Sequence, residues 1–160
     1  MPKTVICKNV LGEECEMPVE KLFFRPSVYG ILIKDNKILL SRQWDGYDFP
    51  GGGIEIGETI PEALEREFKE ETGLQVKIGD FVDFVENFYK YRNTGQCCHS
   101  FLFYYRCQNI GGEITDKYLT DDEKEYCSKA EWIDLKDIEK IKFYNTVNSL
   151  GLIKKASLAS

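Results

Sequence analysis

Apolar residues recur along the chain mainly in short alternating or continuous runs, which predict β-strands. The strand-like runs are residues 4–7, 27–34, 37–42, 75–85, 100–107 and 129–133. The pair Asp35-Asn36 lies between the second and third runs and favours a tight turn, so we expect a hairpin there. Gly111-Gly112 predicts another turn.

The clearest helical signal covers about residues 60–72. Thr59 followed three residues later by Glu62 is a capping box, and Gly73 supplies a left-handed helix end. Two further helices are expected at residues 134–138 and 143–155. The pattern predicts a mixed α/β or α+β domain in which helices flank strands.

The length and composition favour one globular domain over residues 1–160. The chain has 42% hydrophobic and 30% charged residues, and neither a repeat nor a low-complexity linker divides it. This composition excludes collagen-like, coiled-coil and disordered classes.

The charge balance disfavours nucleic acid as a partner. Lys and Arg number 21 against 27 Asp and Glu, giving a net charge of −6, and no basic run is longer than Lys154-Lys155. Small phosphorylated ligands remain possible partners if a divalent cation lies between the negative ligand and the negative protein.

No run of 18 apolar residues occurs, and Met1 to Val10 lacks the apolar segment of a secretory signal. We therefore expect a cytoplasmic protein without membrane contact. The six cysteines are then expected to be reduced thiols, and zinc fits poorly because His99 is the sole histidine and no Cys-x-x-Cys occurs.

Three glutamates on the predicted helix 60–72 share one face. Glu67, Glu70 and Glu71 stand at positions i, i+3 and i+4, where like charges repel. A hard divalent cation would neutralise them, because such cations prefer carboxylate oxygen ligands. The alternative is an ordinary solvated face on which Arg66 and Glu70 form an ion pair.

A glycine-rich segment precedes this helix. Residues 43–57 include three consecutive glycines at 51–53, so we expect a loop with unusual backbone angles. Glycines in series allow a backbone to approach a ligand closely, and a glycine loop beside a carboxylate helix is typical of a metal and phosphate site.

The two features together resemble a known signature. Gly52, five residues, Glu58, seven residues and then Arg66-Glu67-Phe68-Lys69-Glu70-Glu71-Thr72-Gly73-Leu74 is similar to the Nudix box, G-x5-E-x7-R-E-U-x-E-E-x-G-U, where U is a bulky aliphatic residue. Every fixed polar and glycine position matches, and the single departure is Phe68 at a packing position. The resemblance covers residues 52–74.

The resemblance implies an α/β/α sandwich with a mixed β-sheet and hydrolysis of a nucleoside diphosphate linked to another group, with Mg²⁺ or Mn²⁺. Water would attack phosphorus and cleave a P–O–P bond. By matching position, the metal ligands would be Glu67, Glu70, Glu71 and the carbonyl of Gly51. Arg66 and Glu58 would orient these carboxylates, while Gly52 and Gly73 belong to the structural frame of the box.

The general base is left open by the resemblance, which allows a box glutamate such as Glu70 or Glu67, or an acidic residue in the loop before the last strand. That loop holds Asp121, Asp122, Glu123 and Glu125 ahead of Trp132. Spacing favours Glu125, with Glu123 second. A merely solvated acidic loop is the alternative.

Substrate contacts are expected outside the box, from aromatic side chains that stack on a base and from arginines. The candidates are Trp44, Tyr47, Tyr91 and Arg42, with Tyr89, Arg25 and Arg92 behind them. Ordinary packing or surface charge is the alternative for each residue. His99 is expected to be packed or at the surface rather than a base.

The expected activity is that of a nucleoside triphosphate pyrophosphatase that removes non-standard nucleotides. Tyr91 lies 17 residues after Leu74, where dinucleoside polyphosphate hydrolases of the family tend to carry Tyr, so that class is an alternative. The proline that tends to mark ADP-ribose hydrolases is missing at Tyr89 and nearby. A non-catalytic nucleotide-sensing module and an RNA-end pyrophosphohydrolase are further alternatives, and a homodimer is a family-level expectation.

Overall fold

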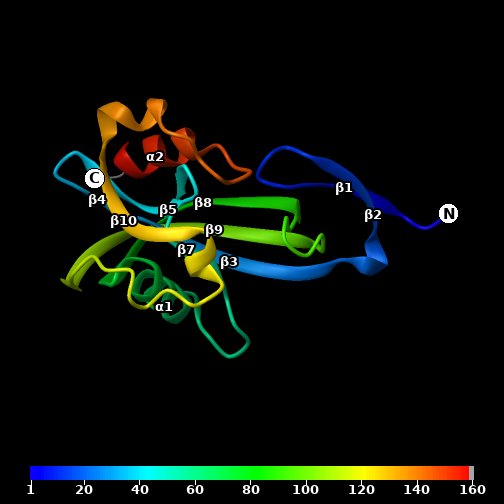
Figure 1. The fold of residues 1–160 in the computed structure, drawn as a ribbon, viewed down its shortest axis with the longest axis horizontal. Helices are drawn as coiled ribbons and strands as arrows, with labels where there is room; N and C mark the ends of the chain where they lie inside the picture. Colours follow the sequence, from blue (N-terminus) through cyan, green and yellow to red (C-terminus); the bar gives the residue numbers. More distant parts are fainter. Residues whose placement is uncertain (159–160) are drawn as a thin grey trace.

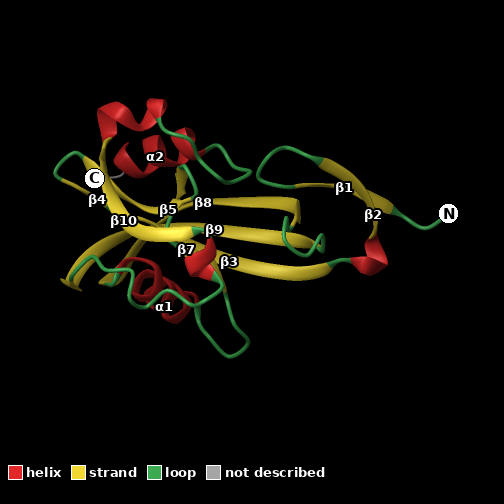
Figure 2. Cartoon of the chain, viewed as in Figure 1, coloured by secondary structure: helices red, strands yellow, loops and turns green. Residues whose placement is uncertain are grey.

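The computed structural model describes residues 1–158, which form ten strands, two α-helices and three short 3₁₀ helices (Figures 1 and 2). The strands are β1 (Thr4–Lys8), β2 (Glu14–Pro18), β3 (Phe23–Ile31), β4 (Ile33–Lys34), β5 (Lys37–Gln43), β6 (Gly46–Asp48), β7 (Gly51–Gly53), β8 (Leu74–Lys90), β9 (Cys97–Gly112) and β10 (Cys127–Asp134). The helices are η1 (Val19–Lys21), α1 (Ile60–Thr72), η2 (Glu123–Glu125), η3 (Leu135–Lys140) and α2 (Ser149–Leu158).

The strands form two sheets. The larger has the order β2-β1-β8-β9-β3-β7, with β1 parallel to β8, β3 parallel to β9 and the other neighbours antiparallel. The smaller has β5 at its centre, paired with β10, β4 and β6. Helix α1 lies on one side of the strands and α2 on the other (Figure 1). This is a mixed, curled sheet between helices, so the expected α+β fold class is confirmed.

Helix α1 has the boundaries that the sequence predicts. Thr59 accepts a hydrogen bond from the backbone N–H of Glu62, whose side chain accepts one from Thr59 in return, and Gly73 ends the helix with φ of 80°. Leu64 and Phe68 are fully buried against the larger sheet. The sheet can approach this closely because a side chain at Gly30 would place its Cβ 2.3 Å from the Phe68 ring.

The glycine segment differs from its expected loop conformation. β7 consists of Gly51–Gly53 and pairs antiparallel with β3, where Tyr29 opposes Gly51 and Ser27 opposes Gly53. The strand β6 also lies inside the expected loop. The glycines therefore form an edge strand of the sheet. This strand can lie directly against α1 because it has no side chains: a Cβ at Gly52 would be 2.6 Å from Oε1 of Glu67.

Other boundaries also differ from the sequence predictions. The helix expected at 143–155 begins only at Ser149, because Tyr144 runs alongside β6 and donates its backbone N–H to Tyr47 O. The expected turn at Gly111-Gly112 is instead the end of β9, and β8 continues to Lys90. The strand expected over 27–34 is divided at Leu32 into β3 and β4. The helix expected at 134–138 lies largely within the 3₁₀ helix η3, and β2 is a strand that the sequence pattern does not predict.

Candidate active site

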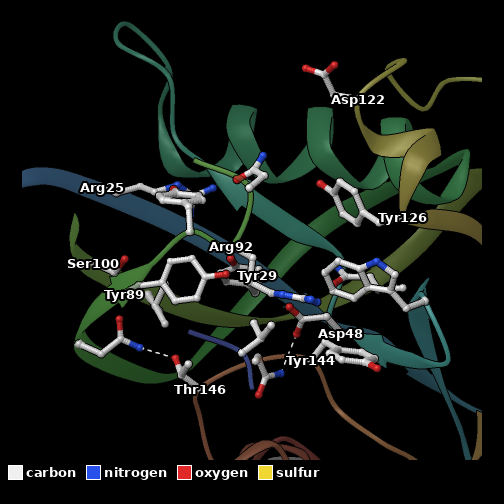
Figure 3. A pocket seen from close by; sticks show the side chains of 18 of the residues that line it. Arg25, Tyr29, Asp48, Tyr89, Arg92, Ser100, Asp122, Tyr126, Tyr144 and Thr146 are labelled. Carbon is white, nitrogen blue, oxygen red and sulfur yellow. Dashed lines mark hydrogen bonds between the residues drawn. The ribbon is translucent and has the colours of Figure 1, made fainter. Parts of the chain in front are cut away.

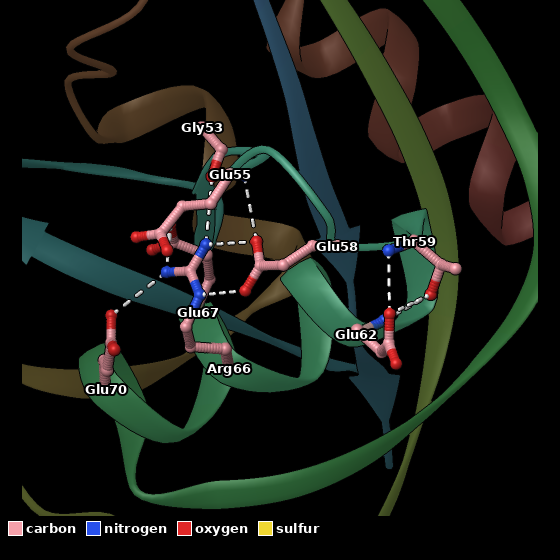
Figure 4. A network of polar contacts seen from close by, with 8 residues as sticks. All are labelled: Gly53, Glu55, Glu58, Thr59, Glu62, Arg66, Glu67 and Glu70. Carbon is pink, nitrogen blue, oxygen red and sulfur yellow. Dashed lines mark hydrogen bonds and ion pairs between the residues drawn. The ribbon is translucent and has the colours of Figure 1, made fainter.

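Arg66 links the glycine edge to the carboxylates of α1 (Figure 4). Its guanidinium donates through Nε and Nη2 to the two carboxylate oxygens of Glu58, at 2.6 and 2.9 Å, and through Nη2 to Gly53 O at 3.0 Å. Nη1 donates to Glu67 at 2.9 Å and to Glu70 at 3.3 Å. This hydrogen bonding to Arg66 lowers the pKa of Glu58 to about 2. These contacts fix the directions of the Glu58, Glu67 and Glu70 carboxylates, as expected of a residue that orients them.

Three glutamates converge beside this network. Glu67 and Glu71 are buried, and together with Glu123 of η2 they offer carboxylate oxygens that all lie within 4.8 Å of one another. Ser41 donates a 2.7 Å hydrogen bond to Glu71, and the backbone N–H of Gly51 donates another at 3.1 Å. We name Glu67, Glu71 and Glu123 the carboxylate trio.

The electrostatics of the trio fit a divalent cation. Burial raises the pKa of Glu71 well above its usual value, and the neighbouring charge of Glu67 adds to the effect. Burial also raises the pKa of Glu67, although Arg66 opposes this. Clustered buried carboxylates are costly unless a cation compensates them, and carboxylate oxygens are the ligands that Mg²⁺ and Mn²⁺ prefer.

The residues expected from the sequence to bind metal occupy different places in this arrangement. Glu67 and Glu71 are in the trio, whereas Glu70 is partly exposed at its edge and interacts with Arg66. Gly51 is next to Glu71, but its N–H, and not the carbonyl expected as a metal ligand, makes the contact with the Glu71 carboxylate. The two candidate residues of the acidic loop before β10 lie in different places. Glu123 belongs to the trio, while Glu125 lines a neighbouring cavity.

That cavity has a volume of about 680 Å³ and lies between β3, β8 and β9, the loops that follow β5 and β8, the η2 region and residues 144–146 (Figure 3). Its aromatic walls include Trp44, Tyr89, Tyr91, Tyr126 and Tyr144. Arg25 and Arg92 supply positive charge, and the Arg92 guanidinium lies 5.4 Å from the centre of the Trp44 ring. Aromatic walls with a few polar groups are typical of a site for a planar ligand.

Two of the expected substrate residues lie elsewhere. Tyr47 and Arg42 are absent from the cavity lining and form a separate cluster with Glu131 of β10. The Tyr47 hydroxyl donates to Glu131 at 2.8 Å, and Arg42 donates to both, at 3.0 Å to Glu131 and 3.2 Å to Tyr47. His99 is outside the cavity as well and is hydrogen-bonded to Glu86.

Sequence reasoning missed several polar residues of the cavity, above all Asp48. This side chain accepts hydrogen bonds from the backbone N–H of Phe49 at 2.7 Å and from Asn145 at 2.7 Å. Burial raises the pKa of Asp48 to about 7. The available signal was its place just before the Phe49-Pro50-Gly51 entry to the glycine segment. Asn145 and Thr146 come from a segment that was expected to be helical.

Comparisons with known proteins identify the family. A family model described as "NUDIX domain" matches residues 23–149. The chain is 35% identical over 130 residues to an ADP-ribose pyrophosphatase of Methanocaldococcus jannaschii, covering 77% of this chain and 70% of the relative. It is 36% identical over 69 residues to an 8-oxo-dGTP diphosphatase of Buchnera aphidicola, covering 39% of this chain and 53% of that protein.

The fold is shared as well. A crystal structure of an ADP-ribose pyrophosphatase from Streptococcus suis superposes with a TM-score of 0.62 at 23% identity, covering 83% of this chain and 91% of the other. Within residues 1–158, no helix combines the length and apolar character needed to cross a membrane. The signature from Gly52 to Leu74, the fold around it and the family match together show that this chain belongs to the NUDIX domain family and is a Nudix hydrolase, an enzyme that cleaves pyrophosphate bonds.

Proposed function

We propose that this enzyme hydrolyses a nucleoside diphosphate linked to a second organic group, with ADP-ribose as the first substrate to test. The observation that carries the proposal is the separation of the carboxylate trio from the cavity. Among the described residues that line the cavity, none belongs to α1. The phosphates would bind at the trio, so the cavity's volume of about 680 Å³ is left for the organic parts of the substrate, which is more than one nucleoside needs.

The residues proposed to hold Mg²⁺ or Mn²⁺ are the four predicted from the sequence, Glu67, Glu70, Glu71 and the Gly51 carbonyl. Glu123, which the sequence suggested only as a second candidate for the base, is added because it lies in the trio. A divalent cation held there neutralises diphosphate charge and makes bound water more acidic. Glu125 is the proposed general base. It lines the cavity on the loop that also carries Glu123, and it is not a member of the trio.

The base of the nucleoside is proposed to stack in the aromatic part of the cavity. Trp44 and Tyr126 have ring centroids 5.4 Å apart, and Tyr144 meets Trp44 edge-on at 4.9 Å. Asp48 and Asn145 contribute polar groups to the same cavity, which can hydrogen-bond to a base edge. The amides and hydroxyls of Asn87, Ser100 and Thr146 are suited to a sugar.

A nucleoside triphosphate, the substrate expected from the sequence, is the second candidate. Arg25 and Arg92 line the cavity and could neutralise additional phosphate charge. The 36% identity to an 8-oxo-dGTP diphosphatase over 69 residues also favours it.

The test is product release from ADP-ribose, dinucleoside polyphosphates, nucleotide sugars and nucleoside triphosphates, with Mg²⁺ or Mn²⁺. The wild type is compared with Glu67→Gln and with Glu65→Gln, whose side chain is exposed on the same helix. We expect ADP-ribose turnover that falls at least about 100-fold in Glu67→Gln and is unchanged in Glu65→Gln.

Turnover confined to nucleoside triphosphates would replace the first candidate with the second. Silence with every substrate, in protein shown by circular dichroism to be folded, would contradict catalysis and favour the nucleotide-sensing module instead.

A further inference from the structure

Three cysteines outside the cavity lining meet where the N-terminal hairpin, β1 and β2, joins the rest of the larger sheet. Cys7 of β1 and Cys15 of β2 are direct cross-strand partners. The sulfur of Cys15 lies 3.7 Å from the sulfur of Cys97, the first residue of β9, although the two are 82 residues apart in sequence. Cys7, on the other strand of the hairpin, is near enough to Cys97 that each thiol affects the pKa of the other.

These thiols are neither part of the cavity nor arranged as a metal site. None of the three residues lines the cavity. Among residues 1–158, the one group of three or more His, Cys, Asp or Glu ligand atoms within 4.8 Å of one another is the carboxylate trio. The geometry therefore favours a reaction between two of the thiols over binding of a metal ion by all three.

The hairpin is held to the rest of the larger sheet by little backbone pairing. β1 and β8 share the single residue pair Lys8 and Tyr89, whereas β1 and β2 pair over five positions. Figure 1 shows the hairpin at the end of the molecule away from α2. A covalent bond at this junction would therefore change its stability. The hairpin also contributes Val10 to the cavity wall.

We propose that Cys15 and Cys97 are a site of reversible thiol oxidation, at which hydrogen peroxide produces a disulfide that fastens the β1–β2 hairpin to the start of β9. In the first step the Cys15 sulfur takes one oxygen from peroxide, giving a sulfenic acid and releasing one water. In the second step the Cys97 sulfur attacks that sulfur. The S–O bond breaks, the Cys97 proton leaves with the hydroxyl as a second water, and the disulfide forms.

The order of the steps follows from exposure. Cys15 is partly exposed, whereas Cys7 and Cys97 are buried, so peroxide reaches Cys15 first. Burial raises the pKa of the Cys97 thiol to about 12, and its interactions with Cys7 and Cys15 add to the effect. Cys97 therefore stays protonated at neutral pH, which slows its own reaction with peroxide. It takes part in the second step because its sulfur lies 3.7 Å from the oxidised Cys15 sulfur.

The experiment treats the full chain with hydrogen peroxide, blocks the remaining thiols and maps disulfide-linked peptides by mass spectrometry. Wild type is compared with Cys15→Ser and with the control Cys98→Ser, which removes the buried neighbour of Cys97. Thermal unfolding with and without dithiothreitol is measured on the same samples.

We expect a Cys15–Cys97 link in wild type and in Cys98→Ser but not in Cys15→Ser. Closing this loop should raise the unfolding temperature by roughly 5–15 °C, and dithiothreitol should reverse the rise. Limited proteolysis should cut the hairpin more slowly in the oxidised protein. A link that joins Cys7 instead, peroxide treatment that leaves both thiols free, or the same link in Cys15→Ser would each overturn the proposal.

Discussion

Asn145 donates a 2.7 Å hydrogen bond from its side-chain amide to Oδ1 of Asp48, which joins the segment before α2 to strand β6 across 97 residues. The carboxylate lies in the cavity wall, and its burial raises its pKa to about 7. Asp48 therefore exchanges its proton close to neutral pH, at the place where we propose that the base of the substrate binds.

The replacement Asp48→Asn should change how stability depends on pH. Folding raises the pKa of Asp48 from 3.8 to about 7, so this group's contribution to stability is complete below pH 3.8 and lost as pH rises through 7. Asparagine does not titrate, so the Asp48→Asn protein does not lose this stability as pH rises. Between pH 4.5 and 8 its free energy of unfolding should improve relative to wild type by roughly 1–3 kcal/mol. Urea unfolding at several pH values measures this, and parallel curves for the two proteins would contradict a titrating Asp48.

Trp44→Ala should weaken substrate binding. Stacking of a base on an aromatic ring contributes about 1–3 kcal/mol, so KM should rise roughly 5- to 150-fold while kcat changes less. Tyr118→Ala is the matched control, because Tyr118 is an exposed aromatic residue outside the cavity lining. Steady-state kinetics on the best substrate decide the matter; an equal effect of the two variants would argue against base stacking at Trp44.

Tyr47→Phe should affect stability and leave binding unchanged. The variant loses the 2.8 Å hydrogen bond to Glu131 and the 3.2 Å bond from Arg42, outside the cavity. We expect about 1 kcal/mol less stability and KM within twofold of wild type. Thermal unfolding and kinetics measure both quantities. A tenfold rise in KM would restore Tyr47 to the substrate site that the sequence suggested.

Arg66→Lys tests whether the orientation of the carboxylates matters. Lysine keeps the charge but cannot make the paired contacts to Glu58 or reach Gly53 and Glu67 at the same time. Loss of groups that orient metal ligands typically costs 10- to 100-fold, so we expect a fall of that size in kcat with circular dichroism unchanged. Unchanged kcat would show that the carboxylates are held without Arg66.

Glu71→Gln separates metal binding from folding. Burial and the charge of Glu67 oppose ionisation of Glu71, so in EDTA above neutral pH the variant should be at least as stable as wild type. Saturating Mg²⁺ should raise the unfolding temperature of wild type by about 5–10 °C and that of the variant much less. Calorimetry with Mg²⁺ and with EDTA checks this, and equal stabilisation of both proteins would exclude Glu71 as a ligand.

Helix α1 could be predicted residue by residue because its signals are local. The Thr59–Glu62 capping box, the left-handed Gly73 and the buried Phe68 all act within one turn of the helix or on its own face. The strand pairing of Gly51–Gly53 could not be predicted in this way. It depends on β3, more than 20 residues away, and on space left by absent side chains, which a local pattern does not encode.

The site shows the same division. Glu67 and Glu71 were predicted from helical spacing, and Trp44 and Tyr91 do line the cavity, but Tyr47 and Arg42 turn toward Glu131. Tyr47 and Trp44 lie in one short segment, yet strand pairing of β5 and β6 directs only one of them into the cavity. Asp48 and Asn145 meet through tertiary structure alone, so no spacing rule finds them.

The absence of α1 from the described cavity lining bears on how such enzymes can diversify. In the proposed binding mode, α1 supplies Glu67 and Glu71 of the trio that holds the phosphates, whereas the organic groups are surrounded by segments outside α1. Substitutions at Trp44, Arg92 or Tyr126 can accumulate without disturbing the box, because they do not contact its carboxylates through any hydrogen bond seen in residues 1–158. A chimera that exchanges the loops after β5, β8 and η2 with those of a relative should therefore inherit the relative's choice of substrate while keeping its own hydrolytic machinery.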